Sequence, residues 1–539
     1  MTTYRTIIGL EVHVQLLTKT KLFCGCSTTF GLPPNSATCP VCCGLPGTLP
    51  VMSRRAFQLA LQAAVALNCS IASFTKWDRK NYYYPDLPKN YQISQYDLPF
   101  SSEGSLEIET SAGTRRIGII RAHLEEDAGK MLHDEYAAAS DSLVDLNRTG
   151  TPLLEIVSKP EIETPEEAKA YIEELRLLLR ELGVSDCEMQ EGSLRCDANI
   201  NLHVPLRGIR FQSCDEPGAI TRLESYATNA AFIATPIIEV KNLNTIRGVE
   251  RALKYEAERQ AKELQDNLDA GVWHIDGSRT SVFRDYQVSP MTRRKSDGTL
   301  GPVSKATAGW DERTGRTEIQ RRKEEASDYR YLPEPDLLPV TVDEATLQRV
   351  RAQLGELPAA QRVRLQAQYA LTANDAGVLS RQGRAFVAYF EAVVKPCGDA
   401  KEACNWTLND LLSTLNERKL DISACPLPPE NLGELIREIK ATGLNKQRAR
   451  EVYGRMLDGL TAKEAIDKLG FKVVADEGQL LDLVRRAIAA NPKAVADFKK
   501  GKVKAADAIK GFVMRETKGM AKTEVVQELL MRELQNTPG

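Results

Sequence analysis

Hydrophobic and polar residues alternate along four short stretches of the N-terminal half of the chain, at 9–16, 121–127, 193–201 and 238–242. Successive side chains of a β-strand point to opposite faces of the sheet, so each stretch predicts a strand with one apolar and one polar face. The polar faces carry Glu11, His13, Gln15, His123, Glu125, Asp127, Arg195, Asp197, Asn199, Asn201, Glu239 and Lys241.

These polar faces allow two interpretations. Every half-exposed antiparallel sheet has a polar face, and for one strand taken alone solvent is the simpler explanation. Solvent faces are usually rich in Thr, Lys and mixed charges, whereas here separate strands contribute Glu, Asp, His, Asn and Arg. Mg²⁺ prefers carboxylate and phosphate oxygens, and Arg and Lys neutralise phosphates. The whole set therefore favours one magnesium-nucleotide site on the open face of the sheet, with Glu155 as a further candidate.

Helical signals are clearest at 165–182 and after residue 345. Thr164 supplies an N-cap, Pro165 the first helical position and Glu167 a capping box, while Gly183 ends the apolar repeat. From about residue 345 onward, Ala, Leu, Glu, Lys and Arg recur at helical spacing. The segment 266–309 is polar, turn-rich and aperiodic, which predicts an insertion that forms a mobile surface loop.

Length and composition limit the class of protein. A chain of 539 residues predicts two to four folded units, and 42% hydrophobic with 27% charged residues is typical of a globular protein. The net charge of -2 excludes an overall polycation, so a nucleic-acid contact requires a local basic patch. No apolar run is long enough to span a bilayer, and the first residues resemble neither a signal nor a transit peptide. We therefore expect a cytoplasmic protein.

Five of the twelve cysteines lie between residues 24 and 43. Cys24 and Cys26 form one close pair, and Cys39 and Cys42 form a second pair, followed by Cys43. Four thiolates on turns can close a tetrahedral zinc site, and such a site is structural because no coordination position stays open. Cys43 is a spare candidate, so the spacing leaves the fourth ligand open. The other cysteines are interpreted as small buried hydrophobic residues.

Two further segments have a simple and a functional interpretation. The stretch 78–96 is rich in tyrosines, which either stack on a nucleobase or form an amphipathic rim. Residues 499–522 hold eight basic and two acidic residues, which is either a solvated helix face or a binding surface for a phosphate backbone. The candidate residues for contact with such a backbone are Lys499, Lys500, Lys502, Lys504, Arg515 and Lys518.

Taken together, these segments resemble the B subunit of glutamyl/aspartyl-tRNA amidotransferase. The resemblance runs through nearly the whole chain and preserves the order of many long motifs. These motifs lie at 9–15, at 24–47 with the cysteine cluster, and at 79–82, 123–130, 145–157, 191–200, 239–244, 328–336, 405–406, 491–493 and 517–519. Compared with this family, the stretch 266–309 looks longer than usual.

The resemblance implies an α+β fold in three parts. A cradle-like domain with an antiparallel sheet and a zinc knuckle spans 1–340, a helical linker domain spans 341–405, and a helical tRNA-binding tail domain spans 406–539. It also implies an amidase subunit and a small C subunit as partners in a heterotrimer, Glu-tRNA(Gln) or Asp-tRNA(Asn) as substrate, and ATP, Mg²⁺ and structural Zn²⁺ as cofactors.

The resemblance also implies roles for individual residues. Glu11, His13, Glu125 and Glu126 match metal-ligand positions, and Asp197 and Glu239 match further acidic positions around the metal and ATP. Arg195, Asn199, Lys241 and Asn242 are the expected nucleotide-binding residues. The activity implied is ATP-dependent phosphorylation of the aminoacyl side-chain carboxylate, followed by amidation with ammonia from glutamine. A non-enzymatic tRNA-binding scaffold and a free-standing ligase for a small acid are the alternatives.

Overall fold

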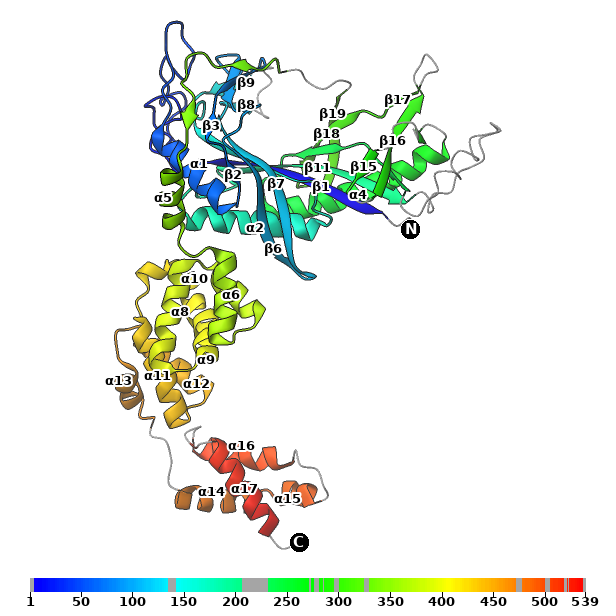
Figure 1. The fold of residues 1–539 in the computed structure, drawn as a ribbon. Helices are drawn as coiled ribbons and strands as arrows, with labels where there is room; N and C mark the ends of the chain where they lie inside the picture. The colour runs from blue at the N-terminus through cyan, green and yellow to red at the C-terminus, as the bar shows by residue number, and fades with distance from the viewer. Residues whose placement is uncertain are drawn as a thin grey trace. The chain divides into compact units, whose positions relative to one another are not determined.

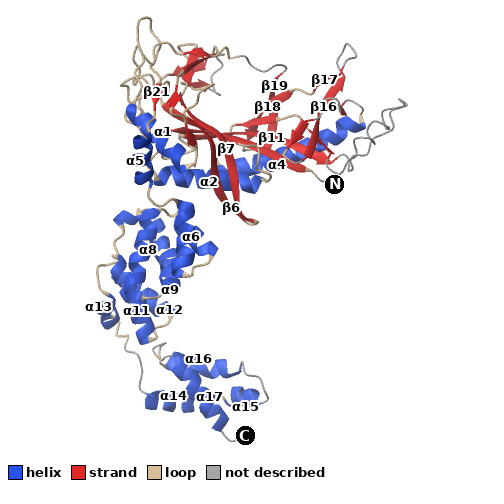
Figure 2. Ribbon diagram, in the orientation of Figure 1, coloured by secondary structure: helices blue, strands red, loops and turns tan. Residues whose placement is uncertain are grey.

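A computed structural model describes residues 4–133, 142–205, 231–270, 273–275, 281–284, 286–294, 300–323, 329–471, 477–499, 505–517, 521 and 523–536. Contacts divide the chain into two compact units, Met1–Leu357 and Pro358–Gly539. The first unit is built around a large sheet and the second is helical (Figures 1 and 2). The predicted α+β class is confirmed at this level, and the two units are described separately below.

The sheet of the first unit has fourteen strands within the described residues. They are β1 (Arg5–Gln15), β2 (Ser70–Ile71), β6 (Ser101–Thr110), β7 (Gly113–Glu126), β10 (Pro152–Ser158), β11 (Leu194–Pro205), β12 (Ala231–Ala234), β13 (Ile238–Lys241), β14 (Trp273–Ile275), β15 (Ser281–Phe283), β16 (Tyr286–Arg294), β17 (Leu300–Pro302), β18 (Lys305–Asp311) and β19 (Arg316–Lys323).

Strand order places β1 at the centre of this sheet. The main path runs β14-β16-β12-β11-β1-β10-β7-β6-β2, and β13 connects β11 to β18. The expected antiparallel pairing holds around β1, but β12 pairs with β16 and β13 with β18 in parallel, so the sheet is mixed. The described residues also form three smaller sheets. The first contains β20 (Leu332–Pro333), β4 (Asp78–Asn81) and β5 (Tyr91–Ser94). The second pairs β21 (Val340–Thr341) with β3 (Phe74–Thr75), and the third pairs β8 (Lys130–His133) with β9 (Ser142–Asp145).

One face of the large sheet is covered by helices. Figure 1 shows α2 (Pro165–Glu181) and α4 (Ile246–Asp269) lying along this face, and α1 (Arg54–Ala66) and α5 (Glu344–Leu354) beside it. Alternate residues of β1, including Leu10, Val12 and Val14, are fully buried in the same hydrophobic core as helix residues. Burial of this apolar face is the main source of stability of the unit and leaves the opposite, polar face of the strands for chemistry.

Helix α2 begins and ends where the sequence predicts, but one hydrogen bond at its N-terminal cap differs from the prediction. The Thr164 side chain accepts a hydrogen bond from the Glu167 backbone N–H, and Gly183 follows the helix with a φ of 63°. The Glu167 carboxylate accepts from the backbone N–H of Glu163 at 2.7 Å and pairs with Arg115, rather than returning to Thr164. The predicted reciprocal capping box is therefore wrong, because Arg115 competes for the same carboxylate.

The prediction of a surface loop at 266–309 is wrong for the part that the structure describes. Helix α4 continues to Asp269, and β16 and β18 extend the main sheet through their pairing with β12 and β13. Val288, Met291, Ala306 and Ala308 from this segment are buried. Strands β14, β15 and β17 have only three residues each, and polar turn residues separate them from β16 and β18, so no long period appears in the sequence. That the segment is an insertion relative to the family stays a prediction.

The second unit contains two separate hydrophobic cores. One involves residues between Leu365 and Phe471, and the other residues between Leu480 and Leu534. Its elements are α6 (Pro358–Tyr369), α7 (Ala373–Arg381), α8 (Arg384–Cys397), α9 (Ala400–Asn405), the π-helix η3 (Trp406–Leu411), α10 (Leu412–Arg418), the 3-10 turn η4 (Ile422–Ala424), α11 (Pro429–Thr442), α12 (Lys446–Met456), α13 (Ala462–Lys468), α14 (Glu477–Ala490), α15 (Pro492–Lys499), α16 (Ala506–Glu516) and α17 (Thr523–Asn536).

The predicted domain limits stay predictions. Strand β21 pairs with β3 and helix α5 packs against α1, which groups residues up to 357 with the sheet. In the part of the chain that is described, no helix is long and apolar enough to cross a membrane.

Candidate active-site cleft

A row of four polar residues crosses the centre of the sheet on its open face. Arg195 of β11 lies directly opposite His13 of β1, His13 opposite Glu155 of β10, and Glu155 opposite His123 of β7. Directly opposed residues of antiparallel strands have Cβ atoms roughly 5 Å apart, so their side chains touch. The register thus brings together residues that are far apart in the sequence, such as His13 and Arg195, which are separated by 182 positions.

Three residues of this region form a group that fits a metal ion. One ligand atom each from His13, Glu125 and Glu155 lies within 4.8 Å of the other two. The His13 Nε2 atom is 3.5 Å from the Glu155 carboxylate, and the Ser94 hydroxyl donates a hydrogen bond to Glu125 at 3.2 Å. Two carboxylates and one imidazole on a cleft suit a divalent cation that keeps water or substrate oxygens as its other ligands.

Burial and mutual attraction set the charges of this group. Burial alone would raise the pKa of Glu155, but the imidazoles of His123 and His13 and the Lys80 ammonium lower it. Burial alone would lower the pKa of His13, but Glu155 raises it. Burial raises the pKa of Glu125. Burial lowers the pKa of His123 to about 4, so that imidazole is neutral near pH 7. The group is thus an anionic centre built around ionised Glu155.

A second polar cluster lies beside the first, on β1, β11 and β13. Asn199 donates a hydrogen bond to the Glu11 carboxylate at 2.8 Å. Lys241 pairs with Asp197 and, at 3.0 Å, with Glu239. Burial and then repulsion by Glu155 raise the pKa of Glu11, while attraction to Asp197 and Glu239 outweighs burial and raises the pKa of Lys241.

His13 and Glu155 of the first cluster and all five residues of the second line one cleft of about 640 Å³. Its walls include Glu11, His13, Asp197, Asn199, Glu239 and Lys241, six of the residues that the sequence predicts for the site. They also include four residues that the sequence analysis did not assign to it, namely Lys80, Arg121, Tyr329 and Tyr331. Lys80 and the tyrosines come from β4 and from the chain beside β20, so no pattern along the strands of the main sheet could have indicated them.

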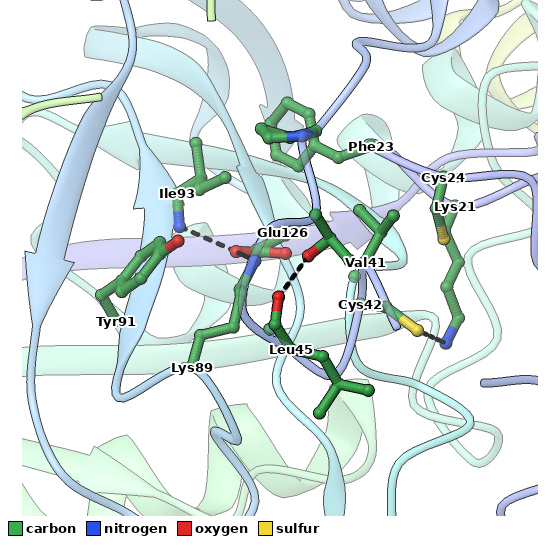
Figure 3. Close-up of a pocket in the computed structure, with 14 residues that line it drawn as sticks. Lys21, Phe23, Cys24, Val41, Cys42, Leu45, Lys89, Tyr91, Ile93 and Glu126 are labelled. Carbon is green, nitrogen blue, oxygen red and sulfur yellow. Dashed lines mark hydrogen bonds and ion pairs between the residues drawn. The ribbon is translucent and has the colours of Figure 1, made fainter. Parts of the chain in front are cut away.

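Glu126 lies on the other face of β7, away from the metal-ligand group. Its carboxylate accepts a hydrogen bond from the Ile93 backbone N–H at 2.9 Å and pairs with Lys89 (Figure 3). These residues line a small pocket of about 70 Å³ together with Lys21 and Cys42. The expectation that Glu126 joins Glu125 at the metal is not supported by this geometry, because neighbouring residues of a strand point to opposite faces.

Two predicted nucleotide-binding residues have other partners or positions. Arg195 donates to Asp127 at 2.8 Å, and Asp127 also accepts a hydrogen bond from Gln15 at 2.8 Å. Asn242 follows β13, is exposed and has a φ of 64°. Arg195 is therefore charge-compensated within the protein, and Asn242 contributes to the turn that leaves β13.

The cysteine cluster forms a compact group of four thiols. Sulfur atoms of Cys24, Cys26, Cys39 and Cys42 all lie within 4.8 Å of one another. The buried Lys21 ammonium is 3.5 Å from the Cys42 sulfur, as Figure 3 shows. A hydrogen bond from Cys24 and the charge of Lys21 lower the pKa of Cys42 to about 4. Four clustered sulfurs with a neighbouring cation fit a tetrahedral Zn²⁺ site, and the geometry selects Cys42 over Cys43 as the fourth member.

The basic tail is only partly described. Lys499 at the end of α15 and Arg515 in α16 are exposed. Lys500, Lys502, Lys504 and Lys518 lie outside the described residues.

The fold and the cleft define a class of protein: a large mixed sheet whose open face carries a cleft of carboxylates, imidazoles and cations, in a chain that also has a helical unit. Comparison with known families makes this specific. The profile described as GatB/GatE catalytic domain matches residues 6–348, and the profile described as GatB domain matches residues 388–534. The chain belongs to the family formed by the B subunits of aspartyl/glutamyl-tRNA(Asn/Gln) amidotransferases.

Relatives with this name match almost end to end. The chain is 46% identical to the B subunit of Rhodopirellula baltica over 529 residues, which is 98% of this chain and 96% of the relative. It is 43% identical to that of Carboxydothermus hydrogenoformans over 536 residues, which is 99% of both chains. The relative from Moorella thermoacetica is 43% identical over 532 residues, 98% of this chain and 100% of the relative.

Proposed function

We propose that this chain is the activating subunit of an aminoacyl-tRNA amidotransferase, a glutamine-hydrolysing ligase of protein biosynthesis. It converts mischarged Glu-tRNA(Gln) or Asp-tRNA(Asn) into Gln-tRNA(Gln) or Asn-tRNA(Asn). The observation that carries the proposal is the cleft itself: a metal-compatible group of His13, Glu125 and Glu155 on the open face of the sheet. The full-length similarity to proteins of that name supports the same activity.

The chemistry explains why such a cleft is needed. A carboxylate resists attack by ammonia because its leaving group would be oxide. An oxygen of the side-chain carboxylate therefore attacks the γ-phosphorus of ATP, the bond from that phosphorus to the β-phosphate oxygen breaks, and ADP leaves. Ammonia then attacks the carbonyl carbon of the acyl phosphate, and phosphate departs with the C–O bond electrons. Bound Mg²⁺ would supply charge neutralisation of the phosphate oxygens.

The described residues have distinct roles in this proposal. His13, Glu125 and Glu155 hold the metal, with Glu11 at its edge oriented by Asn199. Lys241, fixed by Asp197 and Glu239, presents a positive charge to the nucleotide. Arg195 and Asp127 keep the strands around His13 in register through their partly buried ion pair. Preorganised charges of this kind act without reorganisation during the reaction.

The remaining assignments belong to the same proposal. The four-cysteine group holds structural Zn²⁺, and the exposed basic residues of the tail contact the tRNA backbone. Ammonia comes from an amidase subunit, and a small C subunit completes a cytoplasmic heterotrimer. Delivery as uncharged ammonia requires a protected path, because ammonium is not a nucleophile.

The test is amidation of Glu-tRNA(Gln) by the chain with its partner subunits, ATP, Mg²⁺ and glutamine. Wild type is compared with Glu11→Ala and with Glu107→Ala, an exposed acidic residue of β6 on the same sheet. We expect product from wild type and from Glu107→Ala, none from Glu11→Ala, and glutamine hydrolysis in all three. Equal product from all three would favour a tRNA-binding scaffold and overturn the proposal.

A further inference from the structure

Lys80 directs a positive charge into the cleft and forms no direct ion pair among the described residues. It lies on β4, and its ammonium is held over the ring of Tyr329, 5.2 Å from the centroid, with Tyr82 at 6.0 Å. It lines the cleft, yet among the described residues no carboxylate lies within ion-pair distance of it. Attraction to Glu125 outweighs burial and raises the pKa of Lys80, so the side chain stays cationic.

Arg121 is a second cation of the same kind. It precedes His123 by two residues on β7, so it faces the same side of the sheet. Its Nε atom is buried and has no hydrogen-bond acceptor among the described residues. Buried donors in native proteins are nearly always satisfied, so this Nε atom, at the wall of the cleft, can still donate a hydrogen bond to an anionic ligand.

The two cations act at one place. Both line the cleft that is also lined by His123, Glu155 and Tyr331. His123 is 3.6 Å from Glu155 and 3.9 Å from Glu125, two members of the metal-ligand group. Arg121 of β7 and Lys80 of β4 therefore lie in the wall of the cleft that His13 and Glu155 also line.

Two other cations near the metal-ligand group are already paired with carboxylates of the protein. Arg195 is paired with Asp127, and Lys241 with Asp197 and Glu239. Besides Lys305 of β18, the cations that line the cleft and form no ion pair among the described residues are Lys80 and Arg121, and their charge is available for an incoming anion.

We propose that Lys80 and Arg121 form the subsite that binds the terminal phosphoryl group of ATP, between the metal-ligand group and the tyrosine wall of the cleft. This inference rests on the proposed function. A phosphoryl group fits better than a substrate carboxylate, because its three oxygens can contact the metal, the planar guanidinium and the ammonium together. Both side chains stabilise the charge of the group while it is transferred.

The experiment compares binding of two nucleotides to the complete complex by isothermal titration calorimetry. The probes are the Mg²⁺ complexes of ADP and of an ATP analogue with a nitrogen in place of the β–γ bridging oxygen. Lys80→Met and Arg121→Met are measured beside Arg116→Met, a control at an exposed position of the same strand β7. We expect each cleft variant to lose about tenfold or more in affinity for the ATP analogue and less than twofold for ADP. The control should match wild type for both.

Each further outcome has one meaning. Unchanged affinity for the ATP analogue in both cleft variants overturns the inference, and so does a selective rise in the KM for Glu-tRNA(Gln), which would assign the cations to the substrate carboxylate. If wild type itself neither binds the analogue nor amidates, the proposed function fails first. Arg121→Lys, which keeps a charge but not the planar fork, should recover part of the affinity. Glutamine hydrolysis by the partner amidase reports that each complex is assembled.

Discussion

Glu125 and Glu126 are neighbours on β7, yet their carboxylates lie on opposite faces of the sheet. Glu125 belongs to the group with His13 and Glu155, whereas Glu126 pairs with Lys89. We predict that Glu125→Gln weakens Mn²⁺ binding roughly tenfold or more, because a direct ligand is lost, and that Glu126→Gln changes it less than about twofold. Electron paramagnetic resonance of free Mn²⁺ during a titration measures both constants. Equal losses in the two variants would contradict the assignment.

Breaking the Lys89–Glu126 ion pair by removing one partner should strongly destabilise the folded protein. The side chains are 6% and 2% exposed. Removing one partner leaves a buried charge uncompensated, so Glu126→Gln should lower the free energy of unfolding by about 3–5 kcal/mol. Lys89→Met combined with Glu126→Gln should cost much less than the two single changes added together. Urea denaturation followed by tryptophan fluorescence gives the four values. The exposed pair Lys159–Glu103 is the control, and Glu103→Gln should cost under about 1 kcal/mol.

The cysteine group makes a prediction about zinc content. Cys42→Ser should lose bound zinc and lower the melting temperature, because three thiolates no longer close the tetrahedron. Cys43→Ser, one residue further along, should keep one zinc per chain. Mass spectrometry of the metal after dialysis counts the ions, and a chelator should mimic Cys42→Ser in the wild-type protein. Zinc loss in the Cys43 variant alone would reassign the fourth ligand.

His203 should make the first unit sensitive to acid. Burial, aided by the charges of Arg284 and Arg5, lowers its pKa from 6.5 to about 4, and its Nδ1 atom lies 2.9 Å from the Tyr286 hydroxyl. Because the unfolded chain takes up this proton near pH 6.5, the stability contributed by neutral His203 is present above that pH. It is lost as the pH falls toward 4. Melting temperatures of His203→Gln should therefore fall less than those of wild type between pH 7.5 and 4.5. Parallel curves would show that His203 is not responsible.

The tail should act on tRNA but not on ATP. Reversing the charges of Lys499 and Arg515, both exposed, should raise the KM for Glu-tRNA(Gln) several-fold and reduce its salt dependence, since each phosphate contact contributes roughly one unit to the slope. The KM for ATP should stay the same. Lys463→Glu, at an exposed position of α13, is the matched control. An unchanged tRNA affinity in the double variant would place the tRNA contact elsewhere.

Alternation along the sequence correctly assigned the faces of the central strands. Leu194, Cys196 and Ala198 are buried as the period-2 pattern requires, and Asp197 and Asn199 line the cleft. A pattern along one strand does not show which strand lies beside it. The contact of Glu155 with His13 depends on the pairing of β1 with β10, and that register is a property of the folded sheet.

Other site residues could not be predicted from the sequence, for a different reason. Arg121 stands at the start of a stretch whose polar face was recognised, but its unsatisfied Nε is visible only when neighbouring acceptors can be located. Lys80 lies in a segment that was interpreted through its tyrosines, and its direction is set by Tyr329, 249 positions away. Strands in 266–309 were missed because β14, β15 and β17 have three residues each, and because β18 buries Ala306 and Ala308, and alanine is a weak signal for a strand.

Across the described residues, the chain buries its apolar side chains in three cores that share no member, one in the sheet unit and two among the C-terminal helices. None of the described side chains that line the cleft packs in the last of these cores, which begins at Leu480. Substitutions that reshape the tail are therefore free to accumulate without disturbing the carboxylates of the cleft. In evolutionary terms, the packing of the tail and the packing behind the cleft are separately adjustable traits of one polypeptide.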